Sequence, residues 1–296
     1  MSVAHEEDYR RRIAEVGPTR YLPGTSVEIV HEVKLTAAPR FALFDFDGTL
    51  SLVREGWPEV MVPMMVEELV GTGTRESQAE LALLARNFVM ELNGKQTIYQ
   101  MMRLSEEIQA RGGTPRDPLD YKQQYHDRLM ARIADRRRAL ETGTTQPEEL
   151  LVAGAYAALR VLQERGLELY LASGTDENYV REEAALLGLT PFFGRHIYGA
   201  IDDHRKFSKQ MVIERILREN QVDGSRLIGV GDGYVEIDNI KAAGGTAIAV
   251  ASDEAGRSGK ADPWKRDRLI GVGADLVIPD FCQFQAVCDY LWRDFR

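Results

Sequence analysis

The sequence predicts an α/β protein with a doubly wound, parallel sheet and an all-helical insertion. Three observations predict it: five short runs are apolar on both faces, helical segments separate the later runs, and a long stretch between the first two shows only helical periodicity. The chain has 296 residues, 44% of them hydrophobic, which is enough apolar material for a sizeable core. A prior of about 150 residues per domain favours two domains or one large one.

The five apolar runs are the expected strands. A strand of a parallel sheet is covered by helices on both sides, so it reads as a continuous apolar run rather than an alternating one. Ligands of such sheets bind beyond the carboxyl ends of the strands, so the polar residues that follow each run are the first candidates for a site. The runs are residues 41–46, 167–173, 227–231, 246–250 and 276–279, with helices expected at 177–187, 209–220 and 236–243.

The stretch after the first run has helical periodicity and no convincing strand. Its expected helices are residues 59–70, 75–92, 97–111, 119–140 and 147–164, separated by glycine-rich loops. We therefore expect a helical domain at 51–164, inserted into a core domain formed by 41–50 and 165–296. Residues 1–40 contain one β-like run, at 28–33, and are expected to form an N-terminal extension that is flexible or packs at an edge.

Charge and cysteine content limit the possible partners. The 46 acidic residues exceed the 37 basic ones, for a net charge of −9, which disfavours binding to nucleic acid or anionic membranes. Cys282 and Cys288 match no zinc or disulfide pattern and are expected to be reduced thiols. No apolar run is long enough to span a bilayer, and the first residues lack the apolar core of a signal peptide. These features favour a cytoplasmic protein and leave its oligomeric state open.

The first strand ends in Asp45-Phe46-Asp47-Gly48-Thr49. Two carboxylates two residues apart, at a point where the chain leaves the strand, can converge on one ligand. Such a pair can divide the work, one carboxylate remaining ionised as a nucleophile while the other shuttles a proton. The pattern indicates acid–base or nucleophilic chemistry at the end of this strand.

Three further segments place polar groups near the same edge of the sheet. The second strand ends in Ser173-Gly174-Thr175, and the fourth element reads Gly231-Asp232-Gly233 with Glu236 opening the next helix and Ala243-Gly244 after it. Between them lie two candidate lysines, Lys206 and Lys209. Their order and spacing complete a four-part pattern.

This pattern resembles the haloacid dehalogenase superfamily, whose first motif is Asp-x-Asp-Gly-Thr and whose last is Gly-Asp-Gly-x-x-Asp. The resemblance implies a Rossmann-like core with the helical insertion as a cap that opens and closes over the site. It implies that Asp45 is a nucleophile that forms an aspartyl-phosphate and that Asp47 is the general acid/base. The second aspartate distinguishes phosphoryl transfer from dehalogenation in that superfamily, so Asp47 argues against a dehalogenase.

The resemblance also implies roles for the other motifs. Ser173 occupies the Ser/Thr position that contacts the phosphoryl group, with Thr175 a weaker contender and Gly174 supplying a backbone N–H. Lys209, which directly precedes a helix, fits the lysine position better than Lys206 does.

A magnesium ion is the implied cofactor. Mg²⁺ prefers oxygen ligands and binds through one or two carboxylates together with substrate phosphate. Asp45, the backbone carbonyl of Asp47 and Asp232 would form such a set. Glu236 stands where aspartate is commoner, and its longer side chain is expected to reach the metal directly or through water.

We therefore expect a Mg²⁺-dependent phosphatase that acts on a small phosphorylated metabolite such as a sugar phosphate. Arg54 and Lys95 are candidate substrate-binding residues, the first just past the Asp45 motif and the second in a loop between two cap helices. A phosphomutase of the same superfamily is the main alternative, because the outcome depends on how well the cap excludes water. A non-catalytic binding protein is the third, and it predicts a damaged site, whereas all the motif residues are present.

Overall fold

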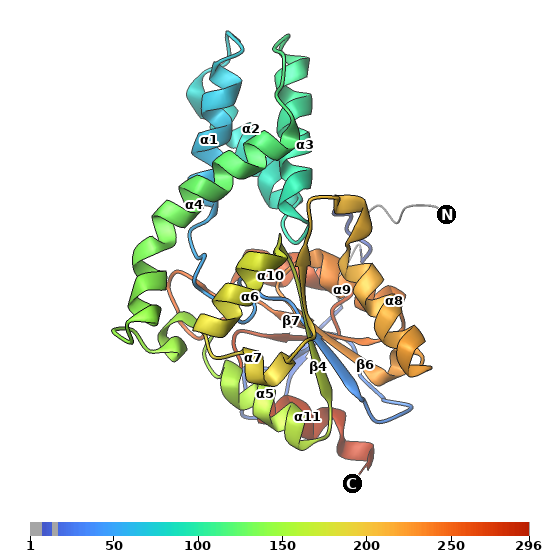
Figure 1. Ribbon diagram of the computed structural model, residues 1–296. Coiled ribbons are helices and arrows are strands. Elements are labelled where there is room, and N and C mark those ends of the chain that lie inside the picture. Colours follow the sequence, from blue (N-terminus) through green and yellow to red (C-terminus); the bar gives the residue numbers. More distant parts are fainter. Residues whose placement is uncertain (1–7, 14–16, 296) are drawn as a thin grey trace.

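The protein, described by a computed structural model over residues 8–13 and 17–295, is built on one eight-stranded sheet (Figure 1). The strand order is β1-β2-β8-β7-β6-β3-β4-β5. All pairings from β8 to β5 are parallel, whereas β1 and β2 join antiparallel at the β8 edge. The strands are β1 (Arg20–Tyr21), β2 (Glu28–Ile29), β3 (Phe41–Phe44), β4 (Glu168–Asp176), β5 (Ile197–Ala200), β6 (Leu227–Gly231), β7 (Thr246–Val250) and β8 (Leu276–Ile278).

The predicted parallel α/β fold is confirmed, and its five expected strands are β3, β4, β6, β7 and β8. Two strands were not predicted: β1 has only two residues, and β5 reads Ile-Tyr-Gly-Ala, in which a glycine interrupts the apolar run. Within the expected N-terminal extension, β2 pairs with β8, so this part packs against the sheet edge.

The register of the central strands brings the candidate residues together. Phe44 of β3 pairs with Leu171 of β4 on one side and with Val230 of β6 on the other. The backbone N–H of Asp45 continues the ladder by donating to the carbonyl of Val230 over 2.9 Å. Because parallel strands end at the same edge, the residues after these three strands meet there.

Helices cover both faces of the sheet. They are α5 (Ala155–Glu164), α6 (Glu177–Leu186), α7 (Thr190–Phe193), α8 (Lys209–Asn220), α9 (Tyr234–Ala242), α10 (Pro263–Gly271) and α11 (Phe284–Leu291), with short 3-10 turns at His204–Lys206, Gly224–Arg226 and Arg293–Phe295. The helices expected at 177–187, 209–220 and 236–243 correspond to α6, α8 and α9. The sequence analysis did not assign α10 and α11.

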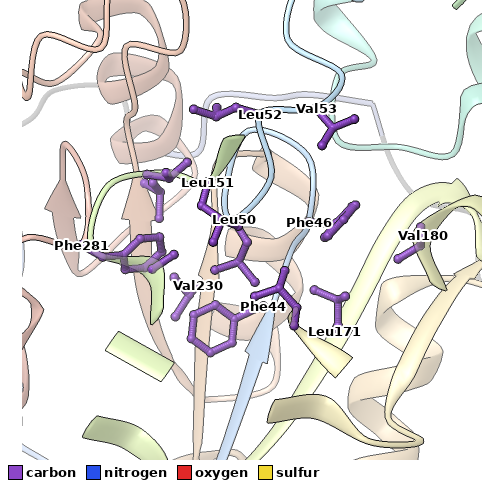
Figure 2. Packing of buried hydrophobic residues seen from close by; sticks show 14 of the residues in the cluster. Phe44, Phe46, Leu50, Leu52, Val53, Leu151, Leu171, Val180, Val230 and Phe281 are labelled. Atoms are coloured by element: carbon purple, nitrogen blue, oxygen red, sulfur yellow. The ribbon is translucent and has the colours of Figure 1, made fainter. Parts of the chain in front are cut away.

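Alternate residues of the central strand enter different cores. Phe44 packs in one buried cluster with Leu171, Val230 and Phe281 (Figure 2), whereas Leu43 belongs to a second cluster. A strand buried on both faces in this way explains why its sequence is apolar throughout rather than alternating.

Four helices of the insertion stand beyond the end of the sheet where the motifs lie (Figure 1). They are α1 (Pro58–Val70), α2 (Gln78–Glu91), α3 (Thr97–Ala110) and α4 (Pro118–Glu141), and each lies within a few residues of the expected helix. Within the described residues, no helix is both long and apolar enough to cross a membrane.

The fifth helix expected in the insertion, at 147–164, is wrong as a single helix. The structure has a 3-10 turn at Pro147–Leu150 and then α5, separated by Gly154 at φ +80°. A Cβ on Gly154 would lie 2.5 Å from the backbone carbon of Phe281, so close packing requires glycine here. Helix α5 packs mainly on α11, α7 and β4. The domain boundaries remain a prediction. By its contacts, α5 packs with the core domain, although the predicted helical domain at 51–164 includes it.

Candidate active site

Asp45 lies at the centre of the site, directly after β3. Its side chain is buried, and Lys209 Nζ donates to Asp45 Oδ1 over 2.8 Å. Lys209 is the first residue of α8, where Ser208 caps the helix by accepting from the N–H of Met211. The ammonium of Lys209 also pairs with Glu236 of α9. A buried lysine is thus held between two carboxylates that come from different strand ends.

Asp47 faces the end of β4. Thr175 Oγ1 donates to Asp47 Oδ2 over 2.8 Å, and Ser173 Oγ lies 3.4 Å from the same oxygen. Ser173 Oγ in turn accepts from the backbone N–H of Thr175 over 3.0 Å. In this structure Thr175, the weaker contender by sequence, makes the shorter contact with the aspartate.

Arg54 lies on the other side of Asp47. Arg54 Nε is 3.8 Å from Asp47 Oδ1, while two guanidinium nitrogens of Arg54 bond to the fully buried Glu183 of α6 over 2.9 Å. Glu183 therefore fixes the guanidinium beside Asp47 by a bidentate contact.

Asp232 is held by a second lysine that the sequence analysis missed. Lys265 Nζ donates to Asp232 Oδ2 over 2.9 Å, to Glu254 Oε1 over 2.6 Å and to Ser252 Oγ over 3.1 Å. These three contacts use all three ammonium protons. The other oxygen of Asp232 accepts from Thr49 Oγ1 over 2.9 Å, so both carboxylate oxygens are constrained.

Gly48 lets the first motif approach Asp232. Its φ is +74°, a region that favours glycine, and a Cβ there would collide with Asp232 Oδ2. Its carbonyl accepts from Ser252 Oγ over 2.8 Å, which ties the turn after β3 to the segment after β7.

The loop between α2 and α3, residues 92–96, closes over the site and is called the cap loop below. A Cβ on Gly174 would lie 2.5 Å from the carbonyl oxygen of Lys95, and a Cβ on Gly94 would lie 3.2 Å from the Cα of Gly233. Gln96 Nε2 donates to the carbonyl of Phe207 over 2.7 Å. The cap loop therefore contacts the segments that carry Ser173, Asp232 and Lys209.

A cavity of about 90 Å³ remains between the motifs and the cap. It is lined by motif residues at its base, together with residues of the cap and of the loop after β3. The lining residues are Asp45, Asp47, Gly48, Ser51, Arg54, Glu55, Trp57, Met61, Asn93, Gly94, Lys95, Thr97, Gln100, Tyr125, Ser173, Gly174, Thr175, Lys209, Asp232, Gly233 and Glu254. Most of the lining residues are charged or polar, so the cavity suits a small polar ligand.

Among the predicted site residues, the two candidate lysines are separated by their surroundings. Lys209 is buried against Asp45, whereas the Lys206 side chain is 73% exposed and pairs with Asp203. Lys95 contributes to the cavity lining, but its ammonium pairs with Asp8 over 2.6 Å. Glu236 lies against Lys209, so its place in a metal site stays a prediction.

The burial of these acids changes their proton affinity. Burial raises the pKa of Asp47 to about 7, with the charge of Glu183 acting in the same direction and that of Arg54 opposing it. Burial also raises the pKa of Asp45; Lys209 lowers this pKa, and the negative charge of Asp232 raises it further. The effect of Asp232 on Asp45 shows that the two carboxylates repel each other across the site.

The donor set fits a magnesium ion. Buried carboxylates outnumber the lysines that face them, and two of these carboxylates, Asp45 and Asp232, follow neighbouring strands. No group of three or more Asp, Glu, His or Cys side chains is arranged as a metal site in the part of the chain that the structure describes. Magnesium does not require one, because two carboxylates, a carbonyl, water and substrate phosphate can complete its octahedron.

The sequence analysis missed Lys265, Glu254 and Ser252, although two signals were present. Ser252 and Glu254 follow the apolar run of β7, and ligands of a parallel sheet bind beyond the carboxyl ends of its strands. Lys265 lies in the first turn of α10, where the helix dipole disfavours a cation, so a lysine there indicates a specific acidic partner.

Comparison with known proteins identifies a matching family. A family model described as haloacid dehalogenase-like hydrolase matches residues 40–244. No curated protein matches the sequence.

Solved structures are similar in fold. A β-phosphoglucomutase from Clostridium difficile has a TM-score of 0.57 at 13% identity, covering 87% of this chain and 99% of its own. A predicted phosphoglycolate phosphatase from Haemophilus somnus has a TM-score of 0.55 at 13% identity, and the match covers 86% of this chain and 99% of that protein. A CbbY variant from Rhodobacter sphaeroides, in complex with xylulose-(1,5)bisphosphate, has a TM-score of 0.53 at 17% identity, and the match covers 83% of this chain and 96% of that protein. At these identities the likeness shows the fold alone.

Proposed function

Because the chain belongs to the haloacid dehalogenase-like hydrolase family, we propose that it is a phosphatase that hydrolyses a small phosphomonoester through an aspartyl-phosphate on Asp45. One observation carries the proposal. The buried Asp45 faces the cavity, has Lys209 on one carboxylate oxygen, and lies beside a second aspartate that can transfer a proton.

In the first step, an oxygen of Asp45 attacks phosphorus while the bond from phosphorus to the leaving oxygen breaks. Lys209 holds Asp45 Oδ1 and orients the carboxylate for this attack. Asp47, held by Thr175, gives its proton to the departing alkoxide. Ser173 and the backbone of Gly174 are assigned to the phosphoryl oxygens.

In the second step, a water attacks the aspartyl-phosphate. Asp47, now ionised, accepts the proton of that water, phosphate leaves, and the carboxylate of Asp45 is regenerated. Proton transfer of this kind contributes roughly 10²–10⁴-fold to a rate. The same aspartate thus serves as acid and then as base.

We assign Mg²⁺ as the cofactor, held by Asp45, the carbonyl of Asp47 and Asp232, with Glu236 as a further candidate. When bound, the ion would neutralise phosphoryl charge that this acidic site otherwise repels. The contacts of Asp232 with Thr49 and Lys265 support its fixed orientation.

The charged and polar lining of the cavity supports a small phosphorylated substrate, such as a sugar phosphate or similar metabolite. Arg54 is the candidate for binding the part of the substrate next to Asp47. Lys95 is a candidate only if its ammonium leaves Asp8, so we expect its backbone to matter at least as much as its charge.

The test is phosphate release from a panel of sugar phosphates, nucleotides and organic acid phosphates with Mg²⁺. We expect Asp45→Asn to abolish turnover without unfolding the protein. Asp135→Asn, at an exposed position of α4, is the matched control and should keep wild-type activity. Wild-type activity in Asp45→Asn would refute the mechanism, and absence of turnover in the native chain despite Mg²⁺ binding would favour a binding protein.

A phosphomutase is the second candidate, because the cap loop packs directly on Gly174 and Gly233 and so limits access of water. A mutase would return the phosphoryl group to the substrate rather than to water. Measuring isomer formation beside phosphate release from the same sugar phosphate distinguishes the two.

We further propose a cytoplasmic protein with a small-molecule substrate rather than a nucleic acid or membrane partner. The acidic net charge supports this, as do Cys282 and Cys288, which are both free thiols. Locating a tagged chain in fractionated cells tests the compartment.

A further inference from the structure

Residues 8–13, called the clasp below, lie outside the family match and bind to the core next to the site. The backbone N–H groups of Arg12 and Ile13 donate to the carbonyl of Gly271 at the end of α10, over 2.8 and 3.0 Å. Arg11 pairs with Asp267 over 2.8 Å and Arg12 with Asp238 over 2.6 Å. The clasp is therefore attached to α10 and to α9, the helix that begins after Gly233.

The ring of Tyr9 extends this attachment towards the cap. The Arg268 guanidinium lies 3.9 Å from the Tyr9 ring centroid and 4.8 Å from that of Tyr234, and the two rings meet edge to face. The same guanidinium donates through Nη2 to the carbonyl of Glu91, the last residue of the cap helix α2, over 2.5 Å. Tyr9 thus helps to orient the arginine that bonds the end of α2, directly before the cap loop.

Asp8 contacts the cap loop itself. Its carboxylate accepts from Lys95 Nζ over 2.6 Å, and this ammonium also lies 5.1 Å from the ring centroid of Tyr99. The Lys95 side chain is 1% exposed, whereas that of Asp8 is 62% exposed. Lys95 is the residue whose carbonyl packs against Gly174.

We propose that the clasp holds the cap loop in its closed position, with Asp8 and Tyr9 as positioning residues that act through Lys95 and Arg268. The segment is anchored on the core by contacts that do not involve the cap. It reaches the cap by one direct contact, from Asp8 to Lys95, and by one indirect contact, from Tyr9 through Arg268 to Glu91. Opening the cap must break the bond from Arg268 to Glu91, which Tyr9 supports, and must either break the pair of Asp8 with Lys95 or lift the clasp from α10. The clasp therefore adds to the free energy of cap opening without touching the reacting atoms.

Hydrogen exchange on the full chain, with neither substrate nor metal present, tests the role of the clasp independently of the proposed activity. Amide exchange in the cap loop reports its opening equilibrium. Because ion pairs with an exposed partner are weak, Asp8→Asn is expected to speed exchange at residues 93–96 by about two- to fivefold. Asp8→Glu keeps the charge and should restore slow exchange.

The matched control is Glu67→Gln on the cap helix α1. Glu67 is 58% exposed and pairs with Arg128 over 2.7 Å, so it resembles Asp8 in exposure and geometry, away from the cap loop. It should leave exchange of the cap loop unchanged. Tyr9→Ala should speed exchange at residues 91–96, because it removes one ring from Arg268.

Two outcomes would overturn the proposal. Unchanged exchange of the cap loop in both Asp8→Asn and Tyr9→Ala would mean that the clasp does not hold it. A uniform increase over the whole chain, with a lower urea midpoint, would mean that these residues act on global stability instead. Failure of every phosphoester substrate would leave the exchange result intact and would count only against the proposed function.

Discussion

Gly174→Ala isolates the contact between the cap loop and the core. Gly174 has no positive φ, so alanine introduces no backbone strain, and only the space around the new methyl group matters. That methyl would lie 2.5 Å from the carbonyl oxygen of Lys95 and 3.0 Å from its carbonyl carbon. These are backbone atoms, which cannot rotate away as the end of a flexible side chain can.

The size of the effect follows from the distance. An ordinary contact requires the Lys95 carbonyl to retreat by roughly 0.9 Å, which moves the cap loop away from the site. A misplacement of about 1 Å can cost 10²-fold in rate, so we expect kcat/KM for phosphate release to fall by about that factor, or about 2.7 kcal/mol in the activation barrier. Because the loop can relieve the overlap by opening, the unfolding free energy should fall by less than the ~1–3 kcal/mol typical of overpacking in a core.

The assay combines steady-state phosphate release with hydrogen exchange at residues 93–96, which should be faster in Gly174→Ala. Gly17→Ala is the control, because a methyl group there has open space and Gly17 has no positive φ. It should match the wild type in both measurements. If Gly174→Ala keeps kcat/KM within twofold and slow loop exchange, the closed contact between Lys95 and Gly174 is not the catalytically relevant arrangement.

Three further predictions follow from buried charges. Lys265→Met leaves Asp232 and Glu254 buried without their cation, so it should lower the free energy of unfolding, measured in urea, by about 3–5 kcal/mol. Adding Glu254→Gln to this variant should recover part of the loss. A loss under about 1 kcal/mol would contradict the stabilising role of the buried ion pairs. Mg²⁺ should raise the unfolding temperature of the wild type, and EDTA should reverse this rise. The unfolding temperature of Asp232→Asn should not change with Mg²⁺, and an equal rise in the wild type and the variant would place the metal elsewhere. Burial and nearby positive groups lower the pKa of His126 to about 3 in the folded chain. In the unfolded chain this imidazole takes up a proton near pH 6.5, so acid favours the unfolded state. The stability that the neutral His126 contributes is present above pH 6.5 and lost as the pH falls towards 3. Between pH 7.5 and 4.5 the wild type should therefore lose about 3 kcal/mol more unfolding free energy than His126→Gln, and an equal loss in the two would contradict the lowered pKa.

The environment of His126 explains the sign of that last effect. Burial is the largest cause of its lowered pKa, followed by the charges of Arg54 and Lys122. Asp176 lies 3.5 Å from its Nδ1, but Lys122 Nζ already pairs with Asp176 over 2.6 Å. Because the Asp176 carboxylate is already paired with Lys122, it does not keep the His126 imidazole charged at neutral pH.

The sequence by itself determined the central strands and the identity of the motif residues. A strand covered on both faces must be apolar at every position, so β3, β4 and β6 are legible from local composition. Parallel pairing then brings the carboxyl ends of these strands to one edge, where Asp45, directly after β3, and Ser173, in the last part of β4, line the same cavity.

Only the tertiary structure decided which charges are paired. Lys206 and Lys209 are three residues apart and chemically equal in the sequence, yet one is exposed and the other is buried against Asp45. Lys265 meets Asp232 across 33 residues, and Asp8 meets Lys95 across 87. Such contacts leave no local periodicity, because burial and the distance between charges depend on how distant segments pack. The composition showed a surplus of acid, and the fold shows that part of it surrounds the cavity, where buried lysines and Arg54 face the carboxylates.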